Sequence, residues 1–227
     1  MAAVAVGYVL VMHNQNRGLA TLCGSGLRAV DLLNVALSPA WVFAASWSGM
    51  LLAMMPPLLT EPVRHLWHAS LPSWRGRALL FFAAGCVALW MLVALPLTAL
   101  AWWVGSALPQ PAGLALVLAA ALMWSLTPHA QRGRNYCHRF ERVRAAGLRA
   151  DLDSCRNGMT LAAACCLVCW PWMLVPLLVG TWHAAVMLAL TMWQLVDRLH
   201  PPRRAVWQVP PVLDPLLVAI ANLRTLD

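Results

Sequence analysis

The sequence contains no lysine and few carboxylates, and both shortages exclude classes of mechanism. All 16 basic residues are arginines, and they face only 8 aspartates and glutamates in 227 residues. No lysine can therefore form a Schiff base or bind phosphate in any reaction of this protein. Charged residues make up 11% of the chain and hydrophobic residues 61%, with a mean hydropathy of +0.68. This balance excludes an ordinary soluble domain and an intrinsically disordered chain.

Several common catalytic motifs are missing as well. The chain has no glycine-rich phosphate loop, no G-x-S-x-G and no H-E-x-x-H, so we expect a binding protein rather than an enzyme. A redox alternative remains, because Cys166 and Cys169 form a C-x-x-C that would suit a membrane thiol oxidoreductase. Such an enzyme normally needs a second cysteine pair on the outer side of the membrane, where this chain offers only Cys23.

Long apolar runs divide the chain into about five membrane spans. A bilayer core about 30 Å thick is crossed by about 20 apolar residues in a helix. The stretches that reach or approach this length are residues 35–59, 78–104, 108–128, 157–180 and 182–199. We predict an all-α, polytopic membrane bundle over residues 35–200, with a basic cytoplasmic loop at 129–156. Residues 1–34 are expected to form a partial or peripheral helix, and residues 201–227 a Pro-rich cytoplasmic tail.

The arginines lie mainly on one side of these spans. They gather between the first and second spans, between the third and fourth, and after the fifth, whereas the turns near Gly105 and Gly180 carry no charge. Because basic loops stay in the cytoplasm, we predict an N-terminus outside and a C-terminus inside. The net charge of +8 thus indicates orientation and contact with anionic headgroups rather than nucleic-acid binding. A helix from Tyr136 to Cys155 is expected to lie on the headgroups.

Potential ligands for soft metals are unusually frequent, with 7 cysteines, 11 methionines and 7 histidines. Cys165 and Cys169 stand four residues apart in the fourth span and share a helix face, with Cys166 beside them. The other candidate ligands are Met50, Met54 and Met55 in the first span, His183 at the start of the fifth, and the adjacent Cys137 and His138 in the basic loop. Thiolate and thioether sulfur favour Cu(I), although cysteine and methionine also pack well as simple hydrophobic residues.

Short motifs between Trp47 and Arg198 match the pattern of one known family. They are Trp47 with Met50 and Ala53-Met54-Met55-Pro56, Gly85 with Trp90, Leu126-Thr127-Pro128 with Cys137, the cluster Cys165-Cys166-Leu167-Val168-Cys169-Trp170, and Asp197-Arg198. Through these motifs the chain resembles a bacterial family of metal-binding integral membrane proteins, some of them labelled copper chaperones. The family's cluster has a cysteine where this chain has Val168, and a Met-Asn pair where it has Trp182-His183. The resemblance implies metal binding, with copper as the first choice.

These observations lead to one functional hypothesis and two rivals. We expect an integral protein of the bacterial inner membrane that holds Cu(I), with zinc as the second choice, between the first and fourth spans. Cys165 and Cys169 would bind the ion, Met50 or Met54 would complete the set, and His183 would control outer access. The ion would pass to a cuproprotein or membrane-complex partner in a chaperone, transport or assembly role. The rivals are a structural subunit of a membrane complex and the thiol oxidoreductase.

Overall fold

The described part of the chain is entirely helical in its regular structure. A computed structural model describes residues 40–139, 141–179, 182–210 and 213, and within them the helices are α3 (Ala40–Leu58), α4 (Thr60–Ala69), α5 (Arg75–Ala107), α6 (Gln110–Leu126), α7 (Pro128–Tyr136), α8 (Leu148–Leu178) and α9 (His183–Leu199). The all-α class is confirmed for these residues. The N-terminal segment 1–34, the turn at Gly180 and tail residues 214–227 lie outside the described residues.

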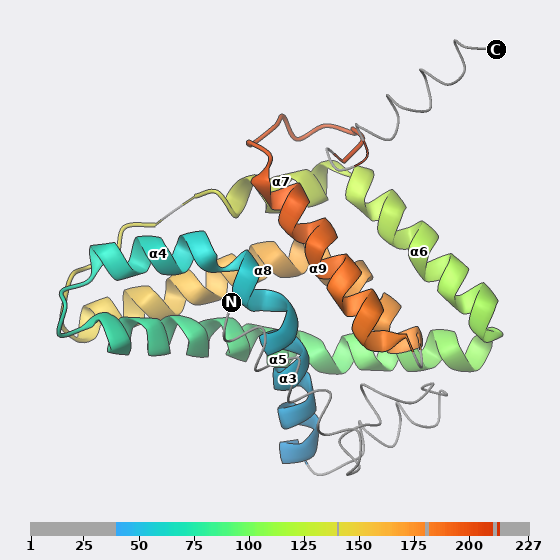
Figure 1. Cartoon of the computed structure of the whole chain (residues 1–227), viewed down its shortest axis with the longest axis horizontal. Coiled ribbons are helices and arrows are strands. Elements are labelled where there is room, and N and C mark those ends of the chain that lie inside the picture. The colour runs from blue at the N-terminus through green and yellow to red at the C-terminus, as the bar shows by residue number, and fades with distance from the viewer. Residues whose placement is uncertain (1–39, 140, 180–181, 211–212, 214–227) are drawn as a thin grey trace.

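Helix α8 is the centre of the arrangement. In the most apolar window of each helix, 83% of residues are buried for α8, compared with 33% for α5 and 44% for α3. Figure 1 shows α8 running alongside α5, with α9 packed across its C-terminal half and α6 closing the far end. A helix that is apolar on all sides is expected in such a central position. Its cysteines at 165, 166 and 169 are therefore interior residues.

Two glycines allow α5 and α8 to approach closely. A Cβ on Gly85 would overlap the backbone carbonyl of Cys155, and a Cβ on Gly158 would overlap that of Phe82. The Cys86 thiol also donates a hydrogen bond to the Gly158 carbonyl, at 3.2 Å. Small residues at a crossing let helix backbones meet, which is how helices commonly associate where no hydrophobic force drives them together. This contact sets the position of α8 relative to α5.

Pro171 lies inside α8 and frees a backbone carbonyl. Proline has no N–H, so the carbonyl of Leu167, four residues earlier, loses its helical donor. The indole nitrogen of Trp124 on α6 donates to that carbonyl at 2.7 Å. A break in one helix thus becomes an attachment point for the next, and it ties α6 to the cysteine-bearing stretch of α8.

A helix corresponds to each of the five predicted spans, although not all are equally long. Among the described residues, α3, α5 and α8 are long and apolar enough to cross a membrane. Helices α6 and α7 would count as a fourth span if their 69° bend is taken as a break within one span. Helix α9, with 17 residues, is shorter than α3, α5 and α8. Three of the predicted spans thus correspond to a helix of sufficient length and apolarity, and the membrane crossing of the third and fifth stays a prediction.

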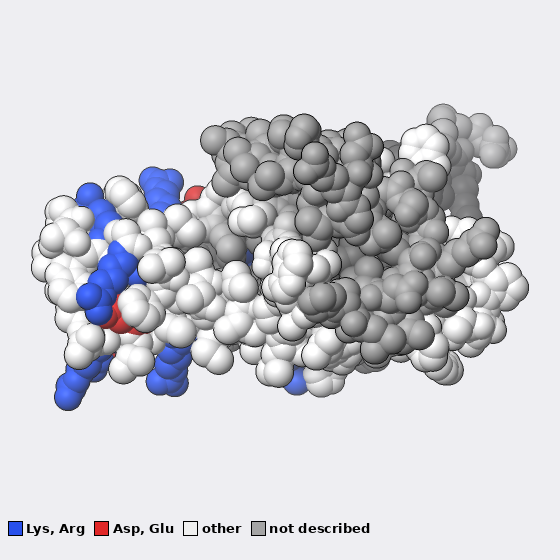
Figure 2. Space-filling view, turned by 90° about the horizontal axis from the view of Figure 1, so that it is seen from below, with Lys and Arg blue, Asp and Glu red and all other residues white. Residues whose placement is uncertain are grey.

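The expectation of a headgroup-bound helix over Tyr136 to Cys155 is wrong. Helix α7 ends at Tyr136, and α8 begins at Leu148 after Gly147, whose φ of 91° stops helix extension backwards. The first turns of α8 pack on α5, where Asp151 pairs with Arg77 at 2.7 Å. This buried carboxylate draws the segment into the bundle. Figure 2 shows basic side chains gathered at this end of the molecule.

Candidate metal centre

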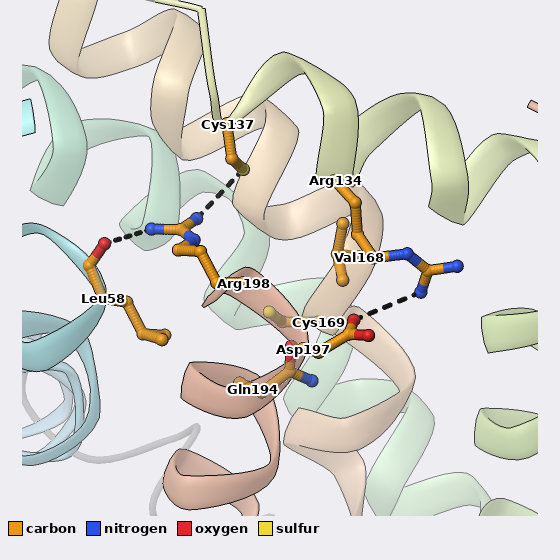
Figure 3. Close-up of a pocket in the computed structure, with 8 residues that line it drawn as sticks. All are labelled: Leu58, Arg134, Cys137, Val168, Cys169, Gln194, Asp197 and Arg198. Carbon is orange, nitrogen blue, oxygen red and sulfur yellow. Dashed lines mark hydrogen bonds and ion pairs between the residues drawn. The ribbon is translucent and has the colours of Figure 1, made fainter. Parts of the chain in front are cut away.

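The C-terminal end of α9 places a guanidinium group against two cysteine sulfurs. Arg198 Nη2 donates to Cys137 Sγ at 2.9 Å and to Cys165 Sγ at 2.9 Å. Arg198 Nη1 donates to the carbonyl of Leu58 at the end of α3 (Figure 3). That carbonyl lacks a helical donor because the residue four positions later is Pro62. The ends of α3, α7 and α9 thus meet the middle of α8 at a single cation.

The two sulfurs beside Arg198 form a pair. Since both contact the same nitrogen, Cys137 Sγ and Cys165 Sγ are separated by at most twice 2.9 Å. Both cysteines are buried, with exposed fractions of 6% and 1%. A neighbouring guanidinium favours the thiolate form of cysteine, which is the form that binds metals. The pair is therefore a preformed soft-donor group with its own counter-charge.

A small cavity adjoins this pair on the side of α9. Its volume is about 20 Å³. The residues that line it are Leu58, Arg134, Cys137, Val168, Cys169, Gln194, Asp197 and Arg198 (Figure 3). Such a volume suits one water molecule or one small ion. Two buried atoms in this lining, Gln194 Nε2 and Asp197 Oδ1, have no hydrogen-bond partner among the described residues. Because buried polar atoms are normally satisfied, the cavity is suited to a small polar guest.

A buried ion pair holds the wall of this cavity. Arg134 Nη1 lies 3.4 Å from Asp197 Oδ2, and both side chains are less than a tenth exposed. Arg134 also donates to the carbonyl of Ser125 at 2.9 Å and to Gln131 Oε1 at 3.0 Å. These bonds satisfy most of the donors of the guanidinium, as a buried charge requires. Asp197 is fixed in this way, and so is the neighbouring Arg198 on α9.

Cys165 also faces a second, larger cavity on its other side. This cavity is apolar, has a volume of about 220 Å³ and lies between α3, α5 and α8. Three of its lining residues carry sulfur, namely Met55 on α3, Cys86 on α5 and Cys165 itself. Cys165 therefore separates an apolar space from the charged group around Arg198.

Comparison with known proteins gives one clear relationship. Searches of curated proteins and of solved structures find no match. A family model described as PpoB2: Copper chaperone matches residues 44–221. The chain belongs to this family. The matched region contains both cavities and every residue of the Arg198 group, and membership supports copper handling in general.

The PpoB2 fold brings some of the predicted ligands together and keeps others apart. Cys137 and Cys165 meet at Arg198, Cys169 lines the small cavity, and Met55 lines the apolar one. Met50, Met54 and Cys166 are buried but line neither of these cavities. His183 begins α9, whereas Arg198 stands near its end, so the length of the helix separates His183 from the sulfur pair.

His138 lies beside the sulfur pair without lining either cavity. Burial lowers the pKa of His138 below its ordinary value, and the nearby positive charge of Arg198 lowers it further. The imidazole is therefore neutral at neutral pH. A neutral imidazole does not compete with Arg198 as a counter-charge for the sulfurs.

The described residues form no closed metal site. No group of three or more His, Cys, Asp or Glu side chains with metal-binding geometry occurs in the part of the chain that the structure describes. All six cysteines in that part are free thiols, including both members of the C-x-x-C. The geometry is that of two convergent sulfurs with further donors nearby, which differs from the four-ligand arrangement of structural zinc.

Sequence reasoning missed the residues that organise the site from α9. In the sequence, Asp197 and Arg198 stand out only as a motif of the resembled family, and Arg198 also as one of the arginines that indicate orientation. Gln194 was not considered. An available signal was the placement of a carboxylate and an arginine at the end of an apolar helix, because ionisable residues near a span are costly and commonly functional.

Proposed function

We propose that this PpoB2 family member is an integral membrane copper chaperone that holds one Cu(I) ion between Cys137 and Cys165. The observation that carries the proposal is the shared contact of both sulfurs with Arg198 Nη2, at 2.9 Å each. Two buried sulfurs, one just after the end of α7 and one in the middle of α8, converge there beside a fixed positive charge. The family match to copper chaperones supports the choice of metal.

The charges of the site favour a monovalent ion. Two thiolates and one Cu(I) carry a net charge of minus one, which the guanidinium of Arg198 neutralises. A divalent zinc ion on the same two thiolates would leave one positive charge unbalanced in a buried place, and this is costly. Thiolate sulfur is also the ligand type that soft Cu(I) prefers.

The neighbouring donors suit release as well as binding. Cys169 lies on the small cavity next to Cys137, and Met55 lies on the apolar cavity next to Cys165. Either sulfur could become a third ligand while one of the first two is exchanged. A chaperone needs such stepwise exchange, because its ion must leave for the thiolate or thioether of a cuproprotein partner.

The exposed surface of the helices supports insertion in a bilayer. Large apolar side chains that are half or more exposed occur along three helices, as Leu80, Leu92 and Leu95 on α5, Leu116 and Met123 on α6, and Leu188 on α9. Water would disfavour such surfaces, whereas lipid chains would accept them. With the basic segments placed in the cytoplasm, the chain would cross the bacterial inner membrane five times and contact anionic headgroups.

Copper binding by the purified full-length protein tests the proposal. In detergent and under reducing, anaerobic conditions, the wild type should retain Cu(I) against a competing chelator. A Cys137→Ser/Cys165→Ser variant should bind at this site about 100-fold or more weakly, because a hydroxyl is a poor ligand for soft copper. Cys155→Ser is the matched control, since Cys155 is a half-buried thiol of α8 away from the pair.

Two results would overturn the proposal. One is a wild type that fails to retain Cu(I), which would favour a structural subunit in which these sulfurs only pack. The other is a double variant that binds copper with the stoichiometry and affinity of the Cys155→Ser control. Zinc supplied in place of copper should bind substoichiometrically.

A further inference from the structure

The contacts between α8 and α9 continue beyond the sulfur pair toward the opposite end of both helices. Cys165 meets Arg198, and Cys169 shares the small cavity with Gln194. Further along, the rings of Trp172 and Trp193 lie 5.5 Å apart, and finally His183 contacts the carbonyl of Pro176. Residue numbers rise along α8 as they fall along α9, so the helices are antiparallel and their register is fixed at both ends.

This register brings two buried methionines, Met173 and Met187, into the same stretch of the interface. Met173 follows Cys169 by four residues and shares its face of α8, while Met187 follows His183 by four residues on α9. Met173 also precedes Pro176 by one turn, so both methionines lie one turn inward from the contact between Pro176 and His183. Met173, Met187 and His183 are each only 1% exposed. Two thioethers and an imidazole are therefore buried within about one helical turn of each other along the interface.

The hydrogen bonding of His183 leaves its second nitrogen in the form that binds metals. His183 Nδ1 lies 2.7 Å from the carbonyl oxygen of Pro176, and an oxygen of this kind can only accept. Nδ1 therefore carries the proton, and Nε2 keeps its lone pair. Nε2 is buried and has no hydrogen-bond partner among the described residues. Metal-binding histidines typically hold their other nitrogen against a carbonyl in this way.

We propose that His183 Nε2, Met173 and Met187 form a second Cu(I) site, separate from the cysteine pair. All three donors are neutral, and the two thioethers select a soft monovalent ion over zinc. Such a site holds copper more weakly than two thiolates with a counter-charge. The proposed function supplies its role: Cys169 stands between the two sites, and an ion would pass along α8 over about 12 Å from Met173 to Cys165.

Copper stoichiometry in the full-length protein tests the second site with matched variants. Met173→Leu/Met187→Leu removes both thioethers with little change in volume. Met159→Leu/Met192→Leu makes the same change on the same two helices at exposed positions, which are 42% and 51% accessible. Under buffered Cu(I), we expect two ions for the wild type and the exposed control, and one ion for the buried variant.

A variant that lacks the cysteines of the first site distinguishes this inference from the proposed function. The variant Cys137→Ser/Cys165→Ser/Cys169→Ser should retain one ion, with nitrogen and thioether sulfur as its neighbours in X-ray absorption spectra. A buried-methionine variant that keeps two ions would overturn the second site, and so would a cysteine variant that binds none. The second site would be rejected and the first preserved by another result: the wild type binds one ion, the cysteine variant binds none, and the buried-methionine variant still binds one.

Discussion

Arg198 is the residue on which the sulfur group depends. Its guanidinium donates to Cys137, Cys165 and the Leu58 carbonyl, which come from three different segments. Arginine is suited to this because its donors form a rigid, planar fork that is always charged. The side chain thus both joins the segments and compensates the charge of the sulfurs.

Replacement of Arg198 by Met should weaken Cu(I) binding by about 10- to 100-fold, the range typical for partners that orient metal ligands. Arg198→Lys should give an intermediate loss, since lysine keeps the charge but not the fork. Chelator competition gives the affinity, and the alkylation rate of Cys165 should fall in parallel because less thiolate is present. Arg139→Met, at an exposed position, controls for net charge. Equal affinity in Arg198→Met and this control would contradict the role given to Arg198.

At the scale of elements, the crossing of α5 and α8 positions the cysteines. Gly85 and Gly158 place each helix against a carbonyl of the other, and Asp151 pairs with Arg77 near the same end. Any outward shift of α8 would move Cys165 away from Arg198 on α9. The geometry of the metal centre therefore depends on a contact about two to three turns away along α8.

Gly85→Ala should destabilise the protein by about 1–3 kcal/mol, because its Cβ would overlap the Cys155 carbonyl. Gly76→Ala lies on the same helix with nothing within 4 Å of the added Cβ, and it should be neutral or stabilising by up to about 1 kcal/mol. Thermal unfolding in detergent measures both. Equal unfolding temperatures for the two variants would contradict this role of Gly85.

For the whole molecule, the two soft-donor groups lie at different levels of one helix interface. The cysteine pair is near the end of α9, where arginines follow, and His183 is at its start. In the proposed orientation the cysteine pair lies toward the cytoplasm and the histidine toward the outer side. Copper would then approach the thiolates from one leaflet and leave toward the other.

Reporter fusions should give the orientation that this arrangement requires. A reporter that works only outside the cytoplasm should be active after Leu108 and after Trp182. A reporter that works only in the cytoplasm should be active after Arg139 and after Arg204, because the arginine-rich segments resist translocation. The sharpest comparison is between Leu108 and Arg139, which flank α6 and α7. An external reporter that is active after Arg139 would contradict the five-span topology.

Local features of the chain were predictable from its sequence. Helix class and the positions of the apolar helices follow from run length and composition, since backbone hydrogen bonds within a helix are local. The shared face of Cys165 and Cys169 follows from helical periodicity for the same reason. The boundary of α8 was misplaced because Asp151, polar by composition, is held against α5 by Arg77.

The partners of each helix face were decided only by the tertiary structure. Cys137 is separated from Arg198 by 61 positions and Cys165 by 33, and no periodicity connects positions so far apart. The sequence alone therefore determined which residues could bind a soft ion and on which helix face they stand. Packing of α5, α8 and α9 decided that Cys137 and Cys165 meet at Arg198 while His183 meets the Pro176 carbonyl, because close contact between distant helices depends on where small side chains let their backbones approach.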